Sequence, residues 1–548
     1  MLRIFLLLNL LPSLFCSFTK NILVTTPWTG GHFSFPLDIA VSLAKTGHNV
    51  TFLALLKDPN IPIPDNINFL EASNISKEIR SLEYLNEVAV KSGALDCPSK
   101  KLISRSITGN QIILEETLKQ IKLRFEYFFE MEMEKLLDDT KFDLIIVEET
   151  IFHPLAVIAR RLAIPLVTAI SVVDQQRAKN EQNYPVLLTS EASQFLNIEK
   201  STPPSFLERA ELFLELGLFI FRLVPGIMNI MAEHLEVAGL KSLTDLDKAT
   251  QLYLVNDHPA ISFPNLKAPN SINVAGIGFN SSTSRLEDDQ DLSLFVESAK
   301  FEGKEIVYVS LGTLAFSMDF YSHIFGDEFL KALLDLGKVA VIVRSDRKYP
   351  KLSGVFAKSW LPQKGLLASS TSLFISSCGN NAKIEAVLSE VPLLCIPLFT
   401  DQYFNSLLVR RNQFGEILLK EDFSFQALQK LTSFMLMNRE KFVNKMRAAS
   451  KAVLQNPATP EQSLVFYCNL LMQHGHLDYL RNEVITGQSI LEIYNLDVVG
   501  LLVLLVLVGL LVLLVIVYSI CKKITFVGWR VLGKARKVTK KIERKKKE

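Results

Sequence analysis

Short apolar runs separated by polar turns dominate the first half of the chain and predict buried strands. Two of these runs flank an amphipathic stretch, Pro36–Ala44, that is predicted to form a helix, and two more flank a helical run at Pro154–Leu162. Strand, helix and strand in this order make a βαβ unit, which implies a parallel sheet. The four predicted strands are Asn21–Thr26, Val50–Leu55, Leu144–Val147 and Leu166–Ile170.

The second half of the chain begins near Ile272 and repeats the alternation, with helices predicted at Asp327–Leu336 and Ala382–Leu388. Its predicted strands are Val307–Ser310, Val339–Val343, Leu373–Ser376 and Leu393–Ile396. We therefore predict an α/β protein with two doubly wound, Rossmann-like domains that face each other across a cleft. Ligands are expected at the carboxyl ends of the strands.

One segment, from Phe206 to Leu235, is denser in apolar residues than its surroundings. Three glutamates, Glu208, Glu211 and Glu215, interrupt it, which excludes a membrane-spanning helix. Two interpretations stay open: helices that cover a hydrophobic cavity or lie on a membrane surface, and ordinary core packing.

Near the C-terminus, Val498–Ile520 contains no charged residue. As a helix it would be about 34 Å long, enough to cross a hydrocarbon core of about 30 Å. Asp497 precedes this stretch and Lys522 begins a basic tail after it, so the tail is predicted to be cytosolic. At the other end, Arg3 and the apolar run Ile4–Phe15 are typical of a signal peptide, which would place the body of the protein in a lumen.

Length and composition fit this organisation, because 548 residues exceed what one hydrophobic core usually serves. The predicted boundaries are a signal peptide at 1–17, a first domain at 18–270, a second domain at 271–455, returning helices and a membrane-proximal segment at 456–497, a transmembrane helix at 498–520 and a basic cytosolic tail at 521–548.

Charge argues against nucleic acid as a partner. The net charge is +2, but the tail after Cys521 holds 12 Lys or Arg against two Glu, so the folded body is acidic. No motif signals a metal site, and no cofactor is expected. Six cysteines do not indicate a disulfide framework. Glycosylation sequons occur at Asn49, Asn74 and Asn280; we discount Asn49 because a buried strand follows it.

The most specific motifs lie between Trp360 and Gln402. Trp360-Leu361-Pro362-Gln363 precedes Ser376-Ser377-Cys378-Gly379-Asn380-Asn381, which is followed by Glu385-Ala386, Val391-Pro392, Pro397 and Asp401-Gln402. This series resembles the donor-binding signature of the UDP-glycosyltransferases, and Ser310-Leu311-Gly312-Thr313 is similar to their first donor loop. With the C-terminal anchor, the chain resembles the membrane-anchored UDP-glucuronosyltransferases over essentially its whole length. The resemblance implies a GT-B fold, with an N-terminal acceptor-binding and a C-terminal UDP-sugar-binding domain.

The resemblance also assigns tasks to individual residues. The indole of Trp360 would stack on uracil, Gln363 would pair with its edge, and Glu385 would accept from the ribose hydroxyls. The diphosphate would lie at a helix start, against Ser377, Gly379 and Asn380. Asp401 and Gln402 would bind the sugar, and Ser310 and Thr313 would close the site from the facing loop. Taken alone, each of these residues more often packs in a core, forms a turn or caps a helix. Their ordered series favours a donor-binding site.

The resemblance places the catalytic base at His32, which follows Gly30-Gly31 after the first strand. An attacking hydroxyl must lose its proton, and imidazole titrates near neutral pH. Glu148 would orient the imidazole, although the family usually has an aspartate there. Glu149 is a competitor that strand alternation should turn the other way. A structural role for the histidine is the alternative.

Three positions depart from the family pattern. Ser377 and Ser369 stand where histidines are usual, and Cys378 replaces a small residue. Since serine carries no positive charge, stabilisation of the leaving group should be weaker. A catalytically silent, ligand-binding or regulatory relative is therefore an alternative, and an unrelated single-span receptor is a third that leaves the donor series unexplained.

The resemblance implies inverting transfer of glucuronate or glucose from a UDP-sugar co-substrate to a hydroxyl of a small lipophilic acceptor, as in detoxification. A single-pass type I protein of the endoplasmic reticulum membrane is expected, because the final Lys545-Lys546-Lys547-Glu548 resembles a dilysine retrieval signal. A tail that only binds the lipid bilayer is the other interpretation. Homo- or hetero-oligomers are compatible with the sequence.

Overall fold

The computed structural model describes most of the two sheets and the C-terminal helix. The described residues are 19–26, 31–54, 61–71, 139–148, 154–171, 250–262, 267–279, 286–312, 326–345, 349, 352–398, 401–419, 422–480, 490–493 and 495–545. The predicted signal peptide, the segment Phe206–Leu235 and the sequons at Asn74 and Asn280 lie outside these residues.

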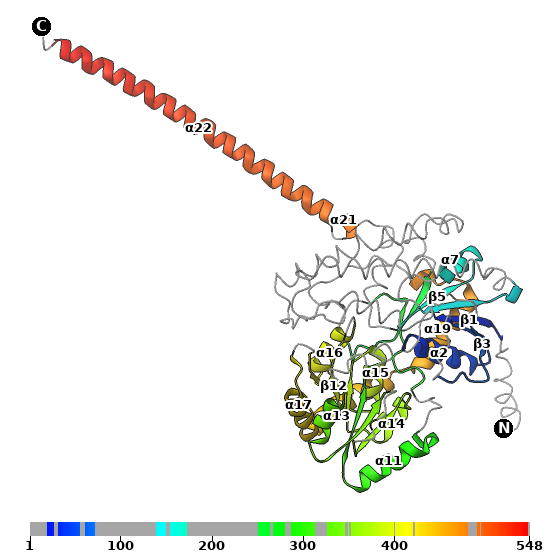
Figure 1. Ribbon diagram of the computed structural model, residues 1–548. Helices are drawn as coiled ribbons and strands as arrows, with labels where there is room; N and C mark the ends of the chain where they lie inside the picture. The colour runs from blue at the N-terminus through cyan, green and yellow to red at the C-terminus, as the bar shows by residue number, and fades with distance from the viewer. Residues whose placement is uncertain are drawn as a thin grey trace, which may run out of the picture. The chain divides into compact units, whose positions relative to one another are not determined.

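The first half of the chain forms a seven-stranded parallel sheet in the order β3-β2-β1-β4-β5-β6-β7 (Figure 1). Its central strands are buried on both faces, which explains why they appear in the sequence as continuous apolar runs. The strands are β1 (Asn21–Thr26), β2 (Asn49–Ala54), β3 (Asn68–Glu71), β4 (Leu144–Glu148), β5 (Leu166–Ile170), β6 (Thr250–Val255) and β7 (Ser271–Asn273). Since β7 belongs to this sheet, the sheet extends one short strand beyond residue 270, where the first domain is predicted to end.

The second half forms a six-stranded parallel sheet in the order β10-β9-β8-β11-β12-β13. Alternate residues of β8 contribute to two different hydrophobic cores, one on each face of the sheet: Ile306 and Tyr308 to one, Val307 and Val309 to the other. The strands are β8 (Glu305–Ser310), β9 (Val339–Arg344), β10 (Val355–Lys358), β11 (Leu373–Ser376), β12 (Leu393–Cys395) and β13 (Gly415–Ile417).

Helices cover both sheets and connect their parallel strands. On the first sheet they are α2 (Gly31–Ala44) and α7 (Pro154–Arg161). On the second half they are α11 (Gln290–Phe301), α13 (Asp327–Leu334), α14 (Gln363–Ser369), α15 (Asn380–Leu388), α16 (Asp401–Arg411), α17 (Phe425–Met437) and α18 (Arg439–Leu454). After α18 the chain returns to the first sheet, because α19 (Pro460–His474) buries Leu464, Cys468 and Leu471 in the core that contains α2.

Each sheet has one point at which the strand order reverses, and this point positions the site. In the first sheet the reversal lies between β1 and β4, and in the second between β8 and β11. The carboxyl ends of such neighbouring strands leave a crevice that helices do not cover, and ligands of open α/β sheets bind there. The predicted α/β fold with two Rossmann-like domains is confirmed.

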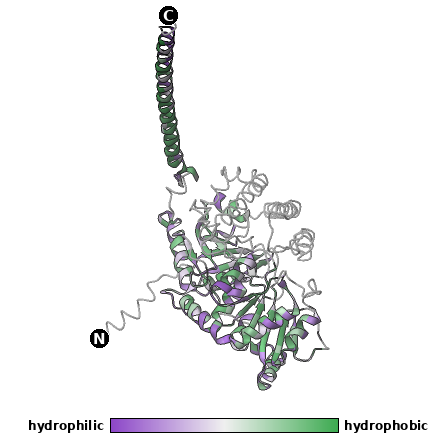
Figure 2. Cartoon of the chain, turned by 90° about the vertical axis from the view of Figure 1, so that its left-hand side faces the viewer, coloured by the Kyte–Doolittle hydropathy of each residue, from purple (hydrophilic) through white to green (hydrophobic). Residues whose placement is uncertain are grey.

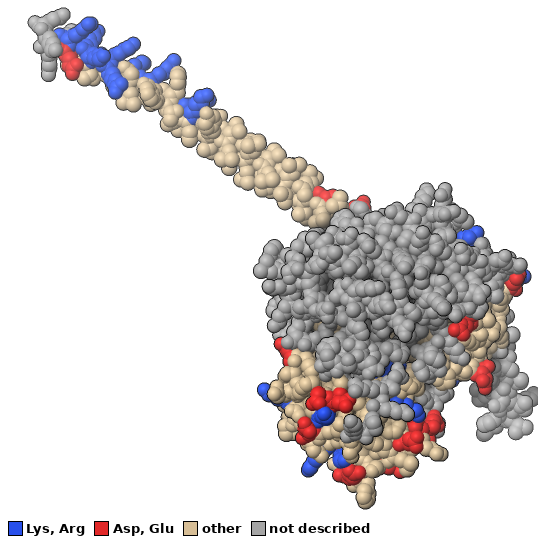
Figure 3. All heavy atoms as spheres, viewed as in Figure 1, with Lys and Arg blue, Asp and Glu red and all other residues tan. Residues whose placement is uncertain are grey.

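The C-terminal part of the chain contains α21 (Ile490–Ile493) and α22 (Leu496–Lys545). α22 is long and apolar enough to cross a membrane, and none of its most apolar window is buried within the protein. Its apolar residues occupy the first part of the helix, and Lys and Arg gather toward its C-terminal end (Figures 2 and 3). The helix therefore fits the predicted membrane anchor followed by a basic tail.

Candidate functional site

The reversal point of the first sheet holds His32 and Glu148. Glu148 is the last residue of β4, and His32 is the second residue of α2, which follows the neighbouring strand β1. His32 Nδ1 lies 2.7 Å from Glu148 Oε1. The Glu148 side chain is fully buried, whereas 29% of the His32 side chain is exposed. The structure thus brings the two residues together, with the imidazole reachable from one side. Glu149 lies outside the described residues.

A hydrogen bond from Thr26 explains how α2 can begin before Pro36 and carry His32. Proline has no N–H group, so Pro36 cannot donate to the carbonyl four residues earlier, which belongs to His32. The hydroxyl of Thr26, at the end of β1, donates to this His32 carbonyl at 2.7 Å instead. α2 therefore starts at Gly31 and not at Pro36, the start that the apolar pattern predicts.

The electrostatic surroundings of His32 favour its protonated form. Burial alone would lower its pKa, but the Glu148 carboxylate, through its charge and its hydrogen bond, and the charge of Asp401 raise the pKa above 6.5. With the Nδ1 proton donated to Glu148, Nε2 is the nitrogen that can accept a proton. The two halves of the chain meet here, because the Asn381 side chain of α15 donates to the Ser34 hydroxyl of α2 at 3.1 Å.

A third polar residue, Ser171, completes this cluster. Ser171 follows β5, and its hydroxyl donates to Glu148 Oε1 at 2.7 Å, the same oxygen that His32 contacts. The serine is buried, with 4% of its surface exposed. It lies directly after the predicted strand Leu166–Ile170, so its place at a strand end was the one signal in the sequence that could have identified it.

We expect Ser171→Ala to lower kcat by roughly tenfold, as for the loss of one hydrogen bond to a charged group. Without this donor, more negative charge of Glu148 faces His32 and raises the pKa of the imidazole further. Since a base must be neutral to act, the acid limb of the pH profile of kcat/KM should move to higher pH. Ser450→Ala, which removes a buried serine of α18, is the control; an unmoved limb in Ser171→Ala would contradict the assignment.

The reversal point of the second sheet brings the two predicted donor loops together. Ser310 ends β8 and Ser376 ends β11, and the two are direct register partners. In the loops that follow, a Cβ atom added at Gly312 would lie 3.3 Å from Ser377 Oγ. Gly312 has φ +90°, a backbone conformation that glycine adopts without strain. Thr313 lies outside the described residues.

α15 begins directly after these loops and meets the first half of the chain. Its N-cap residue, Gly379, makes no side-chain cap, and its first turn holds no acidic residue, so the helix start can accept an anion. The Asn380 side chain donates to the backbone oxygens of Ser171, at 2.9 Å, and Asn256, at 2.8 Å. α15 is therefore linked through Ser171 to the Glu148 carboxylate.

The residues predicted for the nucleoside are also neighbours. Gln363, the first residue of α14, donates to Glu385 Oε2 at 2.7 Å and accepts from the Tyr308 hydroxyl at 3.2 Å. Burial raises the pKa of Glu385, although Lys364 and the Gln363 hydrogen bond oppose this effect. Lys364 in turn bonds Asp38 of α2 at 3.1 Å, a second polar link between the two halves.

Trp360 has a cation over its ring that the motif did not indicate. The guanidinium carbon of Arg344, the last residue of β9, lies 4.8 Å from the ring centroid of Trp360. Arg344 also donates to the backbone oxygen of Ser359 at 3.1 Å. An arginine held over an indole is a cation–π pair, and it fixes the plane on which the uracil is expected to stack.

The residues expected to bind the sugar begin α16. The Asp401 Oδ2 atom accepts from Asn405 at 2.9 Å, and the Gln402 side-chain oxygen accepts from the backbone N–H of Leu398 at 2.9 Å. The Gln402 oxygen therefore binds the backbone that precedes α16. Asp401 lies close enough to His32 to raise the pKa of the imidazole. Ser369, where the family often has histidine, is exposed and bonds its own helix.

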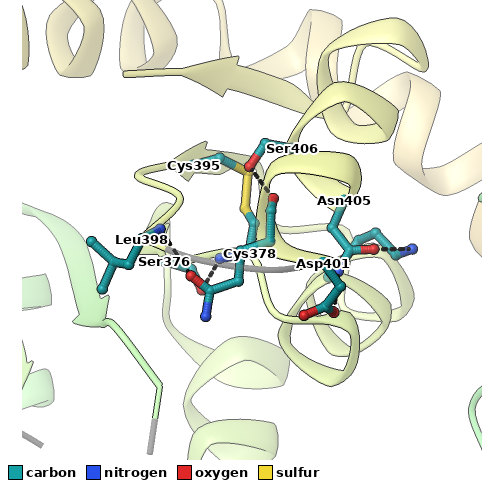
Figure 4. The surroundings of a disulfide bond; sticks show 9 residues. Ser376, Cys378, Cys395, Leu398, Asp401, Asn405 and Ser406 are labelled. Carbon is teal, nitrogen blue, oxygen red and sulfur yellow. Dashed lines mark hydrogen bonds between the residues drawn. A yellow bond between two sulfur atoms is a disulfide. The ribbon is translucent and has the colours of Figure 1, made fainter. Parts of the chain in front are cut away.

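A disulfide bond that the sequence did not predict anchors the loop between β11 and α15. Cys378 and Cys395 are joined, with their Cα atoms 5.4 Å apart, and both are fully buried (Figure 4). Cys395 ends β12 beside Ser376, so the bond connects the loop to the neighbouring strand. Cys378 has φ 61°, in the left-handed region where a residue with a Cβ is strained. Among the described residues, no group of three or more His, Cys, Asp or Glu could hold a metal ion.

Known proteins resemble this chain in both sequence and fold. A family model described as "UDP-glucoronosyl and UDP-glucosyl transferase" matches residues 21–538. UDP-glucuronosyltransferase 3A1 of Bos taurus is 26% identical over 520 residues, which cover 89% of this chain and 91% of that protein. UDP-glucuronosyltransferase 3A2 of Homo sapiens is 26% identical over 506 residues, covering 88% and 90%.

Solved structures agree on the fold. The calicheamicin glycosyltransferase CalG4 superposes with a TM-score of 0.53 at 14% identity, over 83% of this chain and 99% of that one. The glycosyltransferase VinC, solved in complex with dTDP, gives a TM-score of 0.52 at 15% identity over the same shares. Two facing α/β domains of this kind are the GT-B fold. Because the family model matches nearly the whole chain, the chain belongs to the UDP-glucuronosyl and UDP-glucosyl transferase family and is a hexosyltransferase.

Proposed function

We propose that this enzyme transfers glucuronate or glucose from a UDP-sugar to a hydroxyl group of a small lipophilic acceptor, with inversion at the anomeric carbon. His32 Nε2 would remove the acceptor proton as the oxygen attacks the sugar, and UDP would leave in the same step. Glu148 would stabilise the imidazolium that forms. The bond to the acceptor forms as the bond to the diphosphate breaks, so the donor supplies the leaving group and no covalent intermediate is needed.

The His32–Glu148 pair is the observation that carries this proposal. Its 2.7 Å contact lies at the reversal point of the first sheet, and the charge of Asp401 reaches His32 from the second half. A base near the predicted sugar site is what a direct displacement requires. The start of α15 and Ser377, in the loop before it, would hold the diphosphate. Ser377 is neutral, so backbone N–H groups would supply most of the stabilisation there.

We further propose that the enzyme is a single-pass type I protein of the endoplasmic reticulum membrane with its catalytic part in the lumen. The order of apolar and basic residues along α22 supports this orientation. A lipophilic acceptor would partition into the same membrane, and conjugation would make it water-soluble.

The test is to incubate microsomes that carry the full-length protein with labelled UDP-glucose or UDP-glucuronate and a panel of phenols and sterols. Transfer of label to one of these acceptors is expected, together with thermal stabilisation of the detergent-solubilised protein by UDP. Thermal stabilisation by UDP without transfer to any acceptor would favour a silent ligand-binding relative. Absence of both would refute the donor site.

A further inference from the structure

Lys383 is a buried cation that the mechanism above does not use. It lies on α15, and its side chain is completely buried, with 0% exposed. Its Nζ donates to Asn405 Oδ1 at 3.2 Å, and this is its one hydrogen bond within the described part of the chain. A buried ammonium is costly unless charged neighbours compensate it, so its position calls for a reason.

Asn405 connects this ammonium to the residue expected to bind the sugar. Asn405 is also completely buried, and its Nδ2 donates to Asp401 Oδ2 at 2.9 Å. Figure 4 shows Asn405 and Asp401 together on α16, beside the disulfide. An ammonium can only donate, so the amide oxygen must face Lys383 and the NH₂ group must face Asp401. The lysine therefore fixes the orientation of the Asn405 amide, and this amide in turn holds one oxygen of the Asp401 carboxylate.

The charges around Lys383 keep it protonated near neutral pH. Burial lowers its pKa, and the carboxylates of Asp257, after β6, and Asp401, on α16, oppose this effect, which leaves the pKa at about 8. The same proximity means that the ammonium offsets the negative charge of Asp401.

We propose that Lys383 is a positioning residue of the donor site: through Asn405 it orients the Asp401 carboxylate toward the sugar and offsets its charge. The inference rests on the proposed role of Asp401 as a sugar ligand. It predicts that loss of the ammonium weakens binding of UDP-sugars far more than binding of UDP, which has no sugar to contact Asp401.

Lys383→Met tests this in the full-length, detergent-solubilised protein, because methionine keeps much of the side-chain length but carries no charge. We expect the Kd of UDP-glucose and of UDP-glucuronate to rise about tenfold, as for the loss of one charge-assisted contact, while the Kd of UDP changes less than about twofold. Lys441→Met, at an exposed lysine of α18, is the matched control. Equal weakening of UDP and UDP-sugars, or no weakening of either, would overturn the inference.

A pH series separates this role from a merely structural one, and its first measurement uses the wild-type protein alone. In the wild type, affinity for UDP-sugars should fall as pH rises through about 8, where the ammonium loses its proton, whereas affinity for UDP should not. Lys383→Met should show no such fall. The series is repeated in His32→Ala, because His32 also interacts with Asp401. A pH-independent wild type would contradict the proposal; a wild type that binds neither UDP nor UDP-sugar would refute the donor site itself.

Discussion

The His32→Ala variant is expected to lose sugar transfer while it still binds UDP. Removing a general base typically lowers kcat by about 10²–10⁴. Glu148 engages Nδ1, so Nε2 is the nitrogen that would take the acceptor proton. In the variant this proton would have to pass to water, so the loss of kcat should fall in this range. The measurement is kcat with a responsive phenol or sterol, together with the Kd of UDP for the same preparation.

The control for His32 is another histidine that pairs with a carboxylate. His476 Nδ1 lies 3.1 Å from Asp478 Oδ2, but this pair is exposed and distant in the chain from both strand reversals. His476→Ala should keep full activity. In the wild type, the acid limb of kcat/KM should reflect a pKa above 6.5, because a raised pKa keeps the imidazole protonated, and inactive, to higher pH. Full turnover in His32→Ala would remove the base from the mechanism.

Most strands that are buried throughout were predictable from the sequence, although β6, which is also largely buried, was not predicted. β4 and β11 were expected at Leu144–Val147 and Leu373–Ser376, and both are observed, since a strand buried on both faces must be apolar throughout. The short strands β3 and β13 were not predicted. Each lies at an edge of its sheet, and neither is buried throughout, so their sequences show little of the apolar pattern that predicts a strand.

The site was predictable where it depends on strand ends. The carboxyl ends of parallel strands lie at one edge of a sheet, so the approach of His32 to Glu148 followed from the positions of β1 and β4. Ser171, Lys383 and the Cys378–Cys395 bond were not found, because each depends on how neighbouring strands and helices are aligned in the fold. Lys383 stood within the donor motif, but its burial against Asn405 cannot be inferred from spacing.

Loss of the Cys378–Cys395 disulfide is expected to lower the stability of the second domain and to weaken donor binding. The two cysteines are 17 residues apart, and closing a loop of this length contributes about 3 kcal/mol in the chain-entropy account. For a domain of this size, that corresponds to a fall in Tm of roughly 6–12 °C. Cys378 also sets the path of the backbone between Ser377 and Gly379, so a looser loop should raise the Kd of UDP.

Two double variants separate the covalent bond from the backbone strain at Cys378. Cys378→Gly with Cys395→Ala removes the disulfide and relieves the left-handed conformation at φ 61°, whereas Cys378→Ala with Cys395→Ala removes the disulfide and keeps the strain. The alanine pair should therefore be less stable than the glycine pair by about 1 kcal/mol. Cys468→Ala, at a buried free thiol, is the control. Peptide mapping under non-reducing conditions should find the two cysteine peptides linked in the wild type. If they are linked and both double variants keep the wild-type Kd for UDP, the bond stabilises the domain without shaping the donor loop.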